Sequence, residues 1–124
     1  MPILNAIPQL RTTNLNETID FYTSRIGLTV EFRYQDFYAG IRAGKQVFHL
    51  KQVDTKDPSI DFVADGDHFH LYLETDDIMA TAADLRSRGV QFVRDVCETP
   101  WGTREFVIHD DQGHTIYIAE INQD

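Results

Sequence analysis

The chain has 124 residues, 42% of them hydrophobic, a length and composition that suit a single globular domain with a buried core. Its 20 acidic residues against 11 basic ones give a formal charge of -9, which disfavours nucleic acid as a partner. No apolar run has the roughly 20 residues of a membrane helix, and no targeting segment is evident, so we expect no membrane partner and a cytoplasmic location.

The first half of the chain predicts a strand, a helix and three more strands. The first strand is expected at Ile3–Arg11. A helix follows at Leu15–Ile26, because Asn14 can cap it and apolar residues recur at helical spacing until Gly27. Short β-rich runs then predict strands at Leu28–Phe32, Phe37–Ala43 and Gln46–Lys51.

The second half predicts the same order of elements. A strand at His68–Glu74 shows alternation of period two. The next helix begins after Asp76 and Asp77 and ends at Gly89. Three strands are expected after it, at Val90–Val93, Arg104–His109 and Thr115–Glu120.

This repeated order indicates a tandem duplication of one βαβββ unit. The segment between the halves is rich in Asp, contains Pro58 and Gly66, and lacks strong periodicity, which is typical of a linker. We therefore predict one domain over residues 1–124, made of an N-terminal module at 1–55, a linker at 56–66 and a C-terminal module at 67–124.

The strand at His68–Glu74 presents two different faces. Its odd positions are apolar and are expected to pack against the helix. The even positions then face the opposite side, where a half-buried sheet meets water or lines a groove. They are His68, His70, Tyr72 and Glu74.

Histidines two positions apart on one strand face can both reach a divalent ion. His49, in the strand at Gln46–Lys51, is expected to face away from its helix and would supply a third ligand. The alternative is that these polar residues line a solvated surface. Cys97 is the only cysteine, so no thiolate cluster is available within one chain.

Trp101 lies between a proline and a glycine on a constrained loop, and its flat ring suits stacking on a ligand. A core or interface position is the alternative. Arg104 and Glu105 point to opposite faces, and we expect a plain surface position for each; the alternative is that one enters the groove while the other pairs elsewhere. His109 and His114 flank a turn and are expected to face solvent.

Three features together resemble the vicinal oxygen chelate superfamily, and within it the bleomycin resistance proteins. They are the duplicated βαβββ order, the helical segment Ile19-Asp20-Phe21-Tyr22, and the run Pro100–Phe106 followed by Asp110–Gly113. The resemblance covers nearly the whole chain. It implies an α+β fold of two tandem βαβββ modules, with curved mixed sheets and helices on the convex face.

That superfamily includes glyoxalase I, extradiol dioxygenases, fosfomycin-modifying enzymes and antibiotic-sequestering proteins, so the fold does not decide the function. In its enzymes the resemblance implies four metal positions, which fall here on Ile7, His49, His70 and Tyr117. Ile7 has no donor atom, and Tyr117 is a poor metal ligand, because a tyrosine phenol has a reference pKa of about 10 and is protonated at neutral pH. We therefore expect no cofactor; a divalent metal, if bound, would be held by His49, His70 and His68.

The resulting hypothesis is a non-enzymatic homodimer that binds and sequesters a small aromatic or cationic molecule, as in bleomycin-type antibiotic resistance. The resemblance implies crevices at the subunit boundary, and the expected ligand-binding residues are His49, His70, Tyr72, Trp101 and Tyr117. One alternative is a divalent-metal-dependent enzyme of the glyoxalase or dioxygenase type. Another is a domain that binds an ordinary metabolite.

Overall fold

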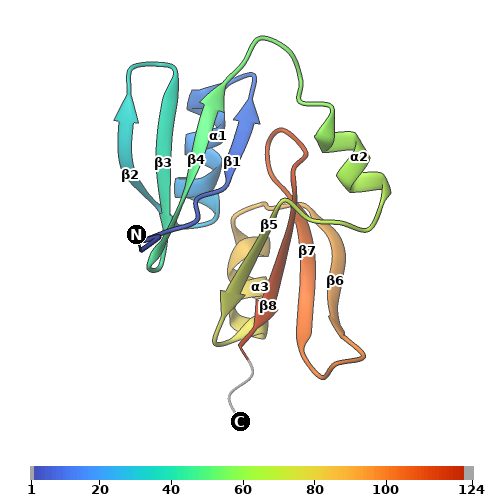
Figure 1. Ribbon diagram of the computed structural model, residues 1–124. Helices are drawn as coiled ribbons and strands as arrows, with labels where there is room; N and C mark the ends of the chain where they lie inside the picture. The colour runs from blue at the N-terminus through green and yellow to red at the C-terminus, as the bar shows by residue number, and fades with distance from the viewer. Residues whose placement is uncertain (1, 122–124) are drawn as a thin grey trace. The chain divides into compact units, whose positions relative to one another are not determined.

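The computed structural model of the protein describes residues 2–121 (Figure 1). The chain divides into two compact units, Met1–Asp57 and Pro58–Asp124. Each unit contains a four-stranded mixed sheet. The predicted α+β fold of tandem βαβββ modules is confirmed, with one additional helix between them.

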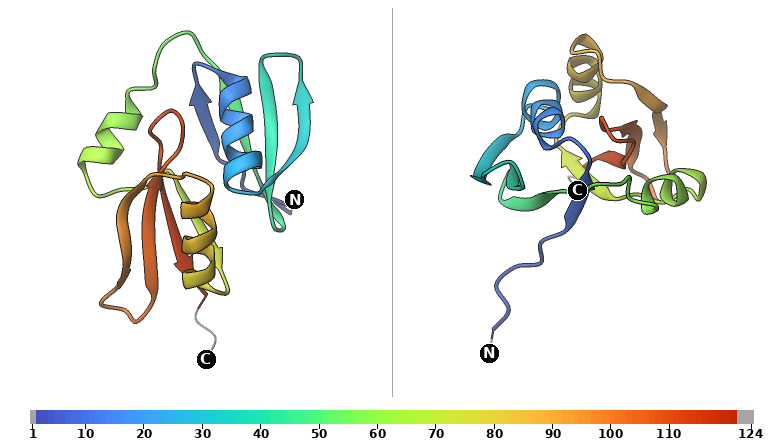
Figure 2. Two further views of the ribbon diagram at one scale, coloured as in Figure 1. Left: turned by 180° about the vertical axis from the view of Figure 1, so that it is seen from behind. Right: turned by 90° about the horizontal axis from the view of Figure 1, so that it is seen from above.

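The N-terminal unit has the strand order β1-β4-β3-β2, with β1 parallel to β4 and the other pairs antiparallel. Helix α1, which continues into one π-helical turn, η1, packs against β3 and β4 (Figure 2). The elements of the N-terminal unit are β1 (Gln9–Thr12), α1 (Leu15–Asp20), η1 (Phe21–Arg25), β2 (Thr29–Tyr34), β3 (Tyr38–Ala43) and β4 (Gln46–Gln52).

The C-terminal unit repeats this topology in the order β5-β8-β7-β6, with β5 parallel to β8. Helix α3 packs against β6, β7 and β8 on one face of the sheet (Figure 2). The elements of the C-terminal unit are α2 (Ser59–Asp65), β5 (Leu71–Thr75), α3 (Ile78–Ser87), β6 (Phe92–Glu98), β7 (Arg104–His109) and β8 (Thr115–Glu120).

Each core lies between a helix and its sheet. In the N-terminal unit the Tyr22 ring is fully buried and meets the Phe48 ring edge-on, with centroids 5.1 Å apart. In the C-terminal unit the buried face combines Ile78 and Leu85 of α3 with strand residues such as Ile116. Burying such side chains contributes about 1.5–3 kcal/mol each, so these faces supply most of the favourable free energy of each unit.

The predicted capping residues, Asn14 and Asp77, lie at the N-termini of α1 and α3. The Asn14 side chain accepts a hydrogen bond from the backbone N–H of Glu17 at 3.1 Å. Asp77 accepts one from Ala80 at the same distance. Each bond satisfies one backbone donor that has no partner inside the helix.

Several predicted boundaries were wrong, among them those of β6, which spans Phe92–Glu98 and not Val90–Val93. Strand β1 begins at Gln9, not at Ile3, and Ile3 is 91% exposed. Pro8, just before β1, has no N–H to donate, which favours a strand end there. The predicted linker contains helix α2, whose Ile60 is 1% exposed and lies against Gly113.

Candidate functional site

Three of the predicted ligand-binding residues meet in a hollow of about 330 Å³ in the C-terminal unit. This volume is at the lower end of the range for small-molecule sites, about 300–1,000 Å³. We call it the aromatic pocket, because four of its seven lining residues are aromatic. It is lined by Asp67, His68, Phe69, Tyr72, Trp101, Glu105 and Tyr117.

The strand register brings the central residues of the aromatic pocket to one face. Tyr72 on β5 pairs with Tyr117 on β8, and Glu105 on β7 pairs with Ala119 on β8. Because side chains alternate along a strand, Ile116 and Ile118 of β8 point the other way, toward α3, and both are buried. The pocket therefore lies on the face of the sheet opposite α3.

Three rings form the floor of the aromatic pocket. The Phe69 ring lies 5.4 Å from the Tyr72 ring and 5.2 Å from the Tyr117 ring, both at tilted angles. The Tyr117 hydroxyl donates to the backbone oxygen of Asp67 at 3.4 Å. Tilted aromatic packing of this kind keeps the rings in fixed positions, so the apolar surface they offer is formed before any ligand arrives.

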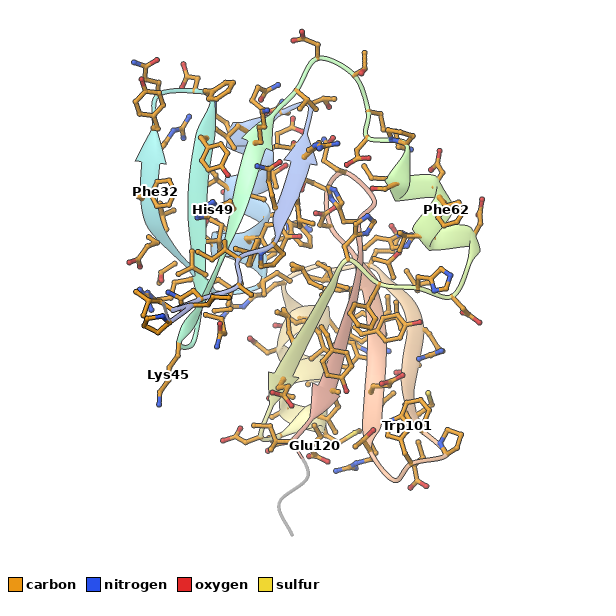
Figure 3. The ribbon with its side chains drawn as sticks, viewed as in Figure 1. Phe32, Lys45, His49, Phe62, Trp101 and Glu120 are labelled. Carbon is orange, nitrogen blue, oxygen red and sulfur yellow. The ribbon has the colours of Figure 1, made fainter. Side chains whose placement is uncertain are left out.

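Trp101 lies on the loop between β6 and β7, with 68% of its surface exposed (Figure 3). The loop is held by a backbone bond of 2.8 Å from Thr99 N to Thr103 O and by a bond of 3.1 Å from Thr103 N to Thr99 Oγ1. Gly102 has a φ of 92°, a conformation that favours glycine. A large ring on a well-held turn is a ready stacking surface for a planar molecule.

Glu105 lines the pocket, although a surface position was expected for it from the sequence. That prediction was wrong, because the residue is only 4% exposed. One carboxylate oxygen, Oε1, accepts a bond of 2.9 Å from Arg94 Nη2. The other, Oε2, is buried and has no hydrogen-bond partner among the described residues. The alternation of β7, read against the turn to β8, was the signal that places Glu105 beside Tyr117.

The electrostatic surroundings keep the Tyr72 phenol neutral. Burial, followed by the negative charges of Glu105 and Glu74, raises the pKa of Tyr72 above its ordinary value. A phenol with a raised pKa remains protonated at neutral pH and can donate a hydrogen bond. Tyr72 is therefore suited to contacting a ligand and not to binding a metal as phenolate.

His70 does not line the aromatic pocket. Strand β5 begins only at Leu71, and the chain bends at His70, so the predicted alternation fails before Leu71 and Phe69 faces the pocket instead. The His70 ring accepts a bond at Nδ1 from Thr115 N at 3.3 Å. Its Nε2 must then carry the proton of a neutral ring, and it donates to Ser59 Oγ at 3.2 Å. The residue joins α2, β5 and β8.

His114 is buried next to His70, which contradicts the expectation that it faces solvent. The two rings meet edge-on with centroids 4.7 Å apart, and His114 is 0% exposed. Its Nδ1 lies 2.8 Å from Asp110 Oδ2. His109, for which the same expectation was made, is half-buried. These histidines belong to the packing of the C-terminal unit.

His49 lies in the N-terminal unit, on the sheet face opposite α1 (Figure 3). Its Nδ1 is 2.9 Å from the Tyr38 hydroxyl, which accepts a bond of 3.0 Å from Gln9 Nε2. The Phe32 ring meets the His49 ring edge-on at 5.2 Å. His49 is thus one member of a polar and aromatic cluster within its own unit.

The donor set does not fit the metal centre that the family's enzymes imply. Within residues 2–121, no three His, Cys, Asp or Glu side chains form a group that could hold an ion. His70 engages both ring nitrogens, and the His68 ring stacks on Phe62 at 6.4 Å. Tyr117 lies among aromatic rings, and Ile7 precedes β1. These residues therefore do not supply the four donors of that centre.

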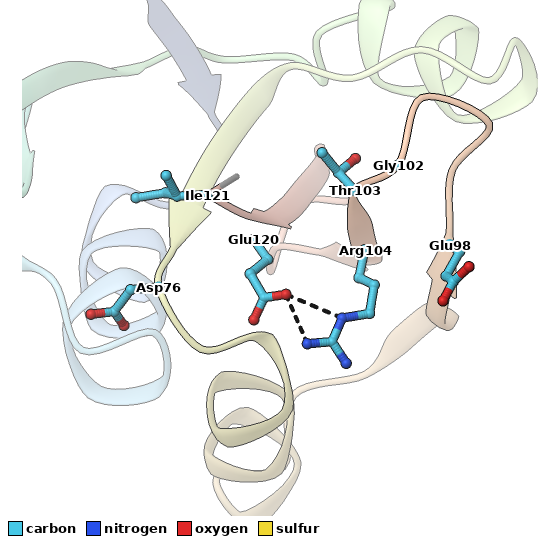
Figure 4. Close-up of a pocket in the computed structure, with 7 residues that line it drawn as sticks. All are labelled: Asp76, Glu98, Gly102, Thr103, Arg104, Glu120 and Ile121. Atoms are coloured by element: carbon cyan, nitrogen blue, oxygen red, sulfur yellow. Dashed lines mark hydrogen bonds and ion pairs between the residues drawn. The ribbon is translucent and has the colours of Figure 1, made fainter. Parts of the chain in front are cut away.

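A second hollow, of about 410 Å³, lies near the ends of β7 and β8 and contains an ion pair (Figure 4). Arg104 donates to Glu120 Oε2 from Nε at 3.1 Å and from Nη2 at 2.8 Å. Glu120 Oε1 accepts from the N–H of Ile78, the first residue of α3, at 3.2 Å. Arg104 and then the Ile78 N–H lower the pKa of Glu120. These groups satisfy each other and tie the sheet to α3.

The comparisons with known proteins agree with this architecture. A sequence profile described as Glyoxalase/Bleomycin resistance protein/Dioxygenase superfamily matches residues 4–118. No curated protein matches the chain. No helix within residues 2–121 has the length and hydropathy to cross a membrane.

Several solved structures share the fold at low sequence identity. A bleomycin-binding protein from Streptomyces verticillus, complexed with copper(II)-bleomycin, is 22% identical over 98% of this chain and 99% of its own, with a TM-score of 0.74. A bleomycin resistance determinant encoded on transposon Tn5 is 19% identical, covering 98% and 100%, with a TM-score of 0.77. A lactoylglutathione lyase from Agrobacterium tumefaciens is 15% identical, covering 96% and 95%, with a TM-score of 0.72.

These neighbours include both binding proteins and an enzyme, and identities this low speak for the fold alone. The profile match extends over most of the chain. The chain belongs to the Glyoxalase/Bleomycin resistance protein/Dioxygenase superfamily.

Proposed function

We propose that this protein is a non-enzymatic cytoplasmic binding protein that sequesters a small aromatic or cationic molecule, in the manner of bleomycin-type antibiotic resistance. The observation that carries the proposal is the aromatic pocket, in which a floor of three rings lies beside the exposed Trp101. Similarity to bleomycin-binding proteins supports it.

The proposed contacts are the side chains of Tyr72, Trp101 and Tyr117, with Phe69 completing the floor. A planar ligand that covers Trp101 removes apolar surface from water and gains ring stacking worth about 0.5–1.5 kcal/mol beyond the buried area. Tyr72 supplies a hydrogen-bond donor at the same place. His49 and His70 stay predicted ligand contacts, and homodimerisation stays a prediction; the mass measured by light scattering after gel filtration tests the latter.

Calorimetric titration of bleomycin and of a panel of planar cationic drugs tests the proposal. At least one compound should bind, and Trp101→Ala should weaken that binding by about tenfold or more, because the mutation removes the largest ring of the pocket. Tyr34→Ala is the control, since Tyr34 is 61% exposed, lies on β2 and is absent from the pocket.

Two results contradict the proposal. One is a wild-type protein that binds none of the compounds. The other is a Trp101→Ala variant that binds each compound as tightly as the wild type does, because the affinity of a ligand bound elsewhere would not depend on that ring.

A further inference from the structure

Glu105 has a charged oxygen that the fold itself leaves without a donor. The residue is 4% exposed, Arg94 contacts Oε1, and no described residue donates to Oε2. A carboxylate oxygen shielded from water without a hydrogen bond is unfavourable, whereas a charge-assisted hydrogen bond to it is among the stronger ones in proteins. Because Glu105 lines the aromatic pocket, a bound molecule is the natural source of that donor.

We propose that Glu105 anchors a positively charged N–H group of the ligand, such as an amidinium, a guanidinium or a protonated amine carried by a planar ring. This inference rests on the proposed function and sharpens it. The proposed function allows a ligand that is either aromatic or cationic, and the Glu105 anchor favours one that is aromatic and cationic.

The position of Glu105 supports this assignment. It lies on the same sheet face as Tyr117, because Val107, two residues along β7, pairs with Tyr117 on β8. A ring that stacks on the pocket floor therefore brings its substituents to the neighbourhood of the carboxylate. Glu105, which β7 contributes to the lining of the pocket, is a charged acceptor, which disfavours a neutral hydrocarbon ligand.

The charges around the pocket favour a cation. Asp67 and Glu105 both line it, while the guanidinium of Arg94 pairs with Glu105 and lies 5.5 Å from the Tyr117 ring. Two carboxylates against one guanidinium leave an excess of negative charge. Burial is the main cause of the raised pKa of Tyr72, and the negative charges of Glu105 and Glu74 add to it.

A matched pair of probes tests the anchor. 2-Naphthamidine and 2-naphthamide share one ring system, but only the first carries a positive charge on its N–H donors. In calorimetric titrations of the full chain, the amidine should bind about tenfold or more tightly than the amide, because hydrogen bonds between charged partners are roughly twice as strong as neutral ones.

Glu105→Gln keeps the shape of the side chain and removes its charge, so it should reduce the preference for the amidine to about twofold or less. Glu98→Gln is the control. Glu98 is an exposed residue of β6 in the same unit, it does not line the aromatic pocket, and its replacement makes the same change in net charge. This control should keep the wild-type preference.

The outcomes separate this inference from the proposed function. Equal binding of both probes to the wild type, or an unchanged preference in Glu105→Gln, overturns the anchor and leaves the aromatic pocket standing. Binding of neither probe contradicts the pocket and the anchor together. The wild-type comparison requires no variant, and circular dichroism verifies that Glu105→Gln is folded.

Discussion

Replacing Asp110 by alanine should destabilise the C-terminal unit strongly. The Asp110 side chain is 0% exposed and accepts three hydrogen bonds, from the backbone N–H of Gln112 at 3.0 Å and from His114 N and Nδ1, each at 2.8 Å. Each bond contributes about 0.5–1.5 kcal/mol net, and the donors left behind in the interior add a desolvation penalty. The free energy of unfolding should fall by about 3–5 kcal/mol, a large share of the roughly 5–15 kcal/mol typical of a domain.

Urea unfolding followed by far-ultraviolet circular dichroism measures this change. Asp110→Asn should lose less, about 1–2 kcal/mol, because the amide oxygen can still accept from the backbone. Asp36→Ala is the control: this side chain is 93% exposed and pairs only at the surface with Arg33, so its loss should change stability by about 0.5 kcal/mol or less. A loss under about 1 kcal/mol for Asp110→Ala would refute the reasoning, since the variant removes two buried hydrogen bonds and one part-buried one.

Three further outcomes are expected. Arg104 holds the pKa of Glu120 below its ordinary value of 4.5. The stability that the Glu120 carboxylate contributes is therefore present above that value and is lost as pH falls through the folded pKa. The difference in Tm between wild type and Glu120→Gln should shrink from pH 7 to pH 3. A Cβ at Gly40 would overlap the Phe32 ring, so Gly40→Ala should cost about 1–3 kcal/mol in urea titrations and become neutral or stabilising when Phe32 is also alanine. Trp101→Ala, despite its effect on binding, should change the free energy of unfolding by about 0.5 kcal/mol or less, because the ring is 68% exposed.

The elements with strong local signals were predicted well. Strands β7 and β8 have the predicted ends, and both helix caps make the expected side-chain bonds. Alternation, turn residues and capping residues act over a few positions, so they are readable in one sequence. Helix α2 has no such signal. Its seven residues depend on tertiary contacts, including the burial of Ile60 and the bond between Ser59 and His70.

The candidate site was predicted in part, for the same physical reason. Tyr72, Trp101 and Tyr117 meet in one pocket, because a correct register on β5 and β8 brings the tyrosines together. The error at His70 follows from the late start of β5: a strand that begins at Leu71 imposes no alternation on earlier residues, so the face they occupy is set by the bend and by contacts distant in sequence. Glu105 was missed because charged residues are usually exposed.

The two units repeat the same contacts between helix and sheet, although their exposed sheet faces differ in chemistry. In each, two threonine hydroxyls, one on the first strand and one on the helix, lie 2.7 Å apart. In each, the last residue of the last strand accepts a bond from the first N–H of that helix. The equivalent bonds are Thr12–Thr18 and Thr75–Thr81, then Leu15–Gln52 and Ile78–Glu120.

These repeated bonds lie on the helix side of each sheet, so the opposite side is free to change without loss of the fold. There the N-terminal unit carries Gln9, Tyr38 and His49, which two hydrogen bonds through the Tyr38 hydroxyl join into one cluster. The C-terminal unit carries the aromatic pocket and Glu105, whose Oε2 accepts no hydrogen bond from residues 2–121. A buried carboxylate oxygen without a donor favours a ligand that supplies one. The faces that diverged after duplication are thus unequal in chemistry, and the C-terminal one is where binding is favoured.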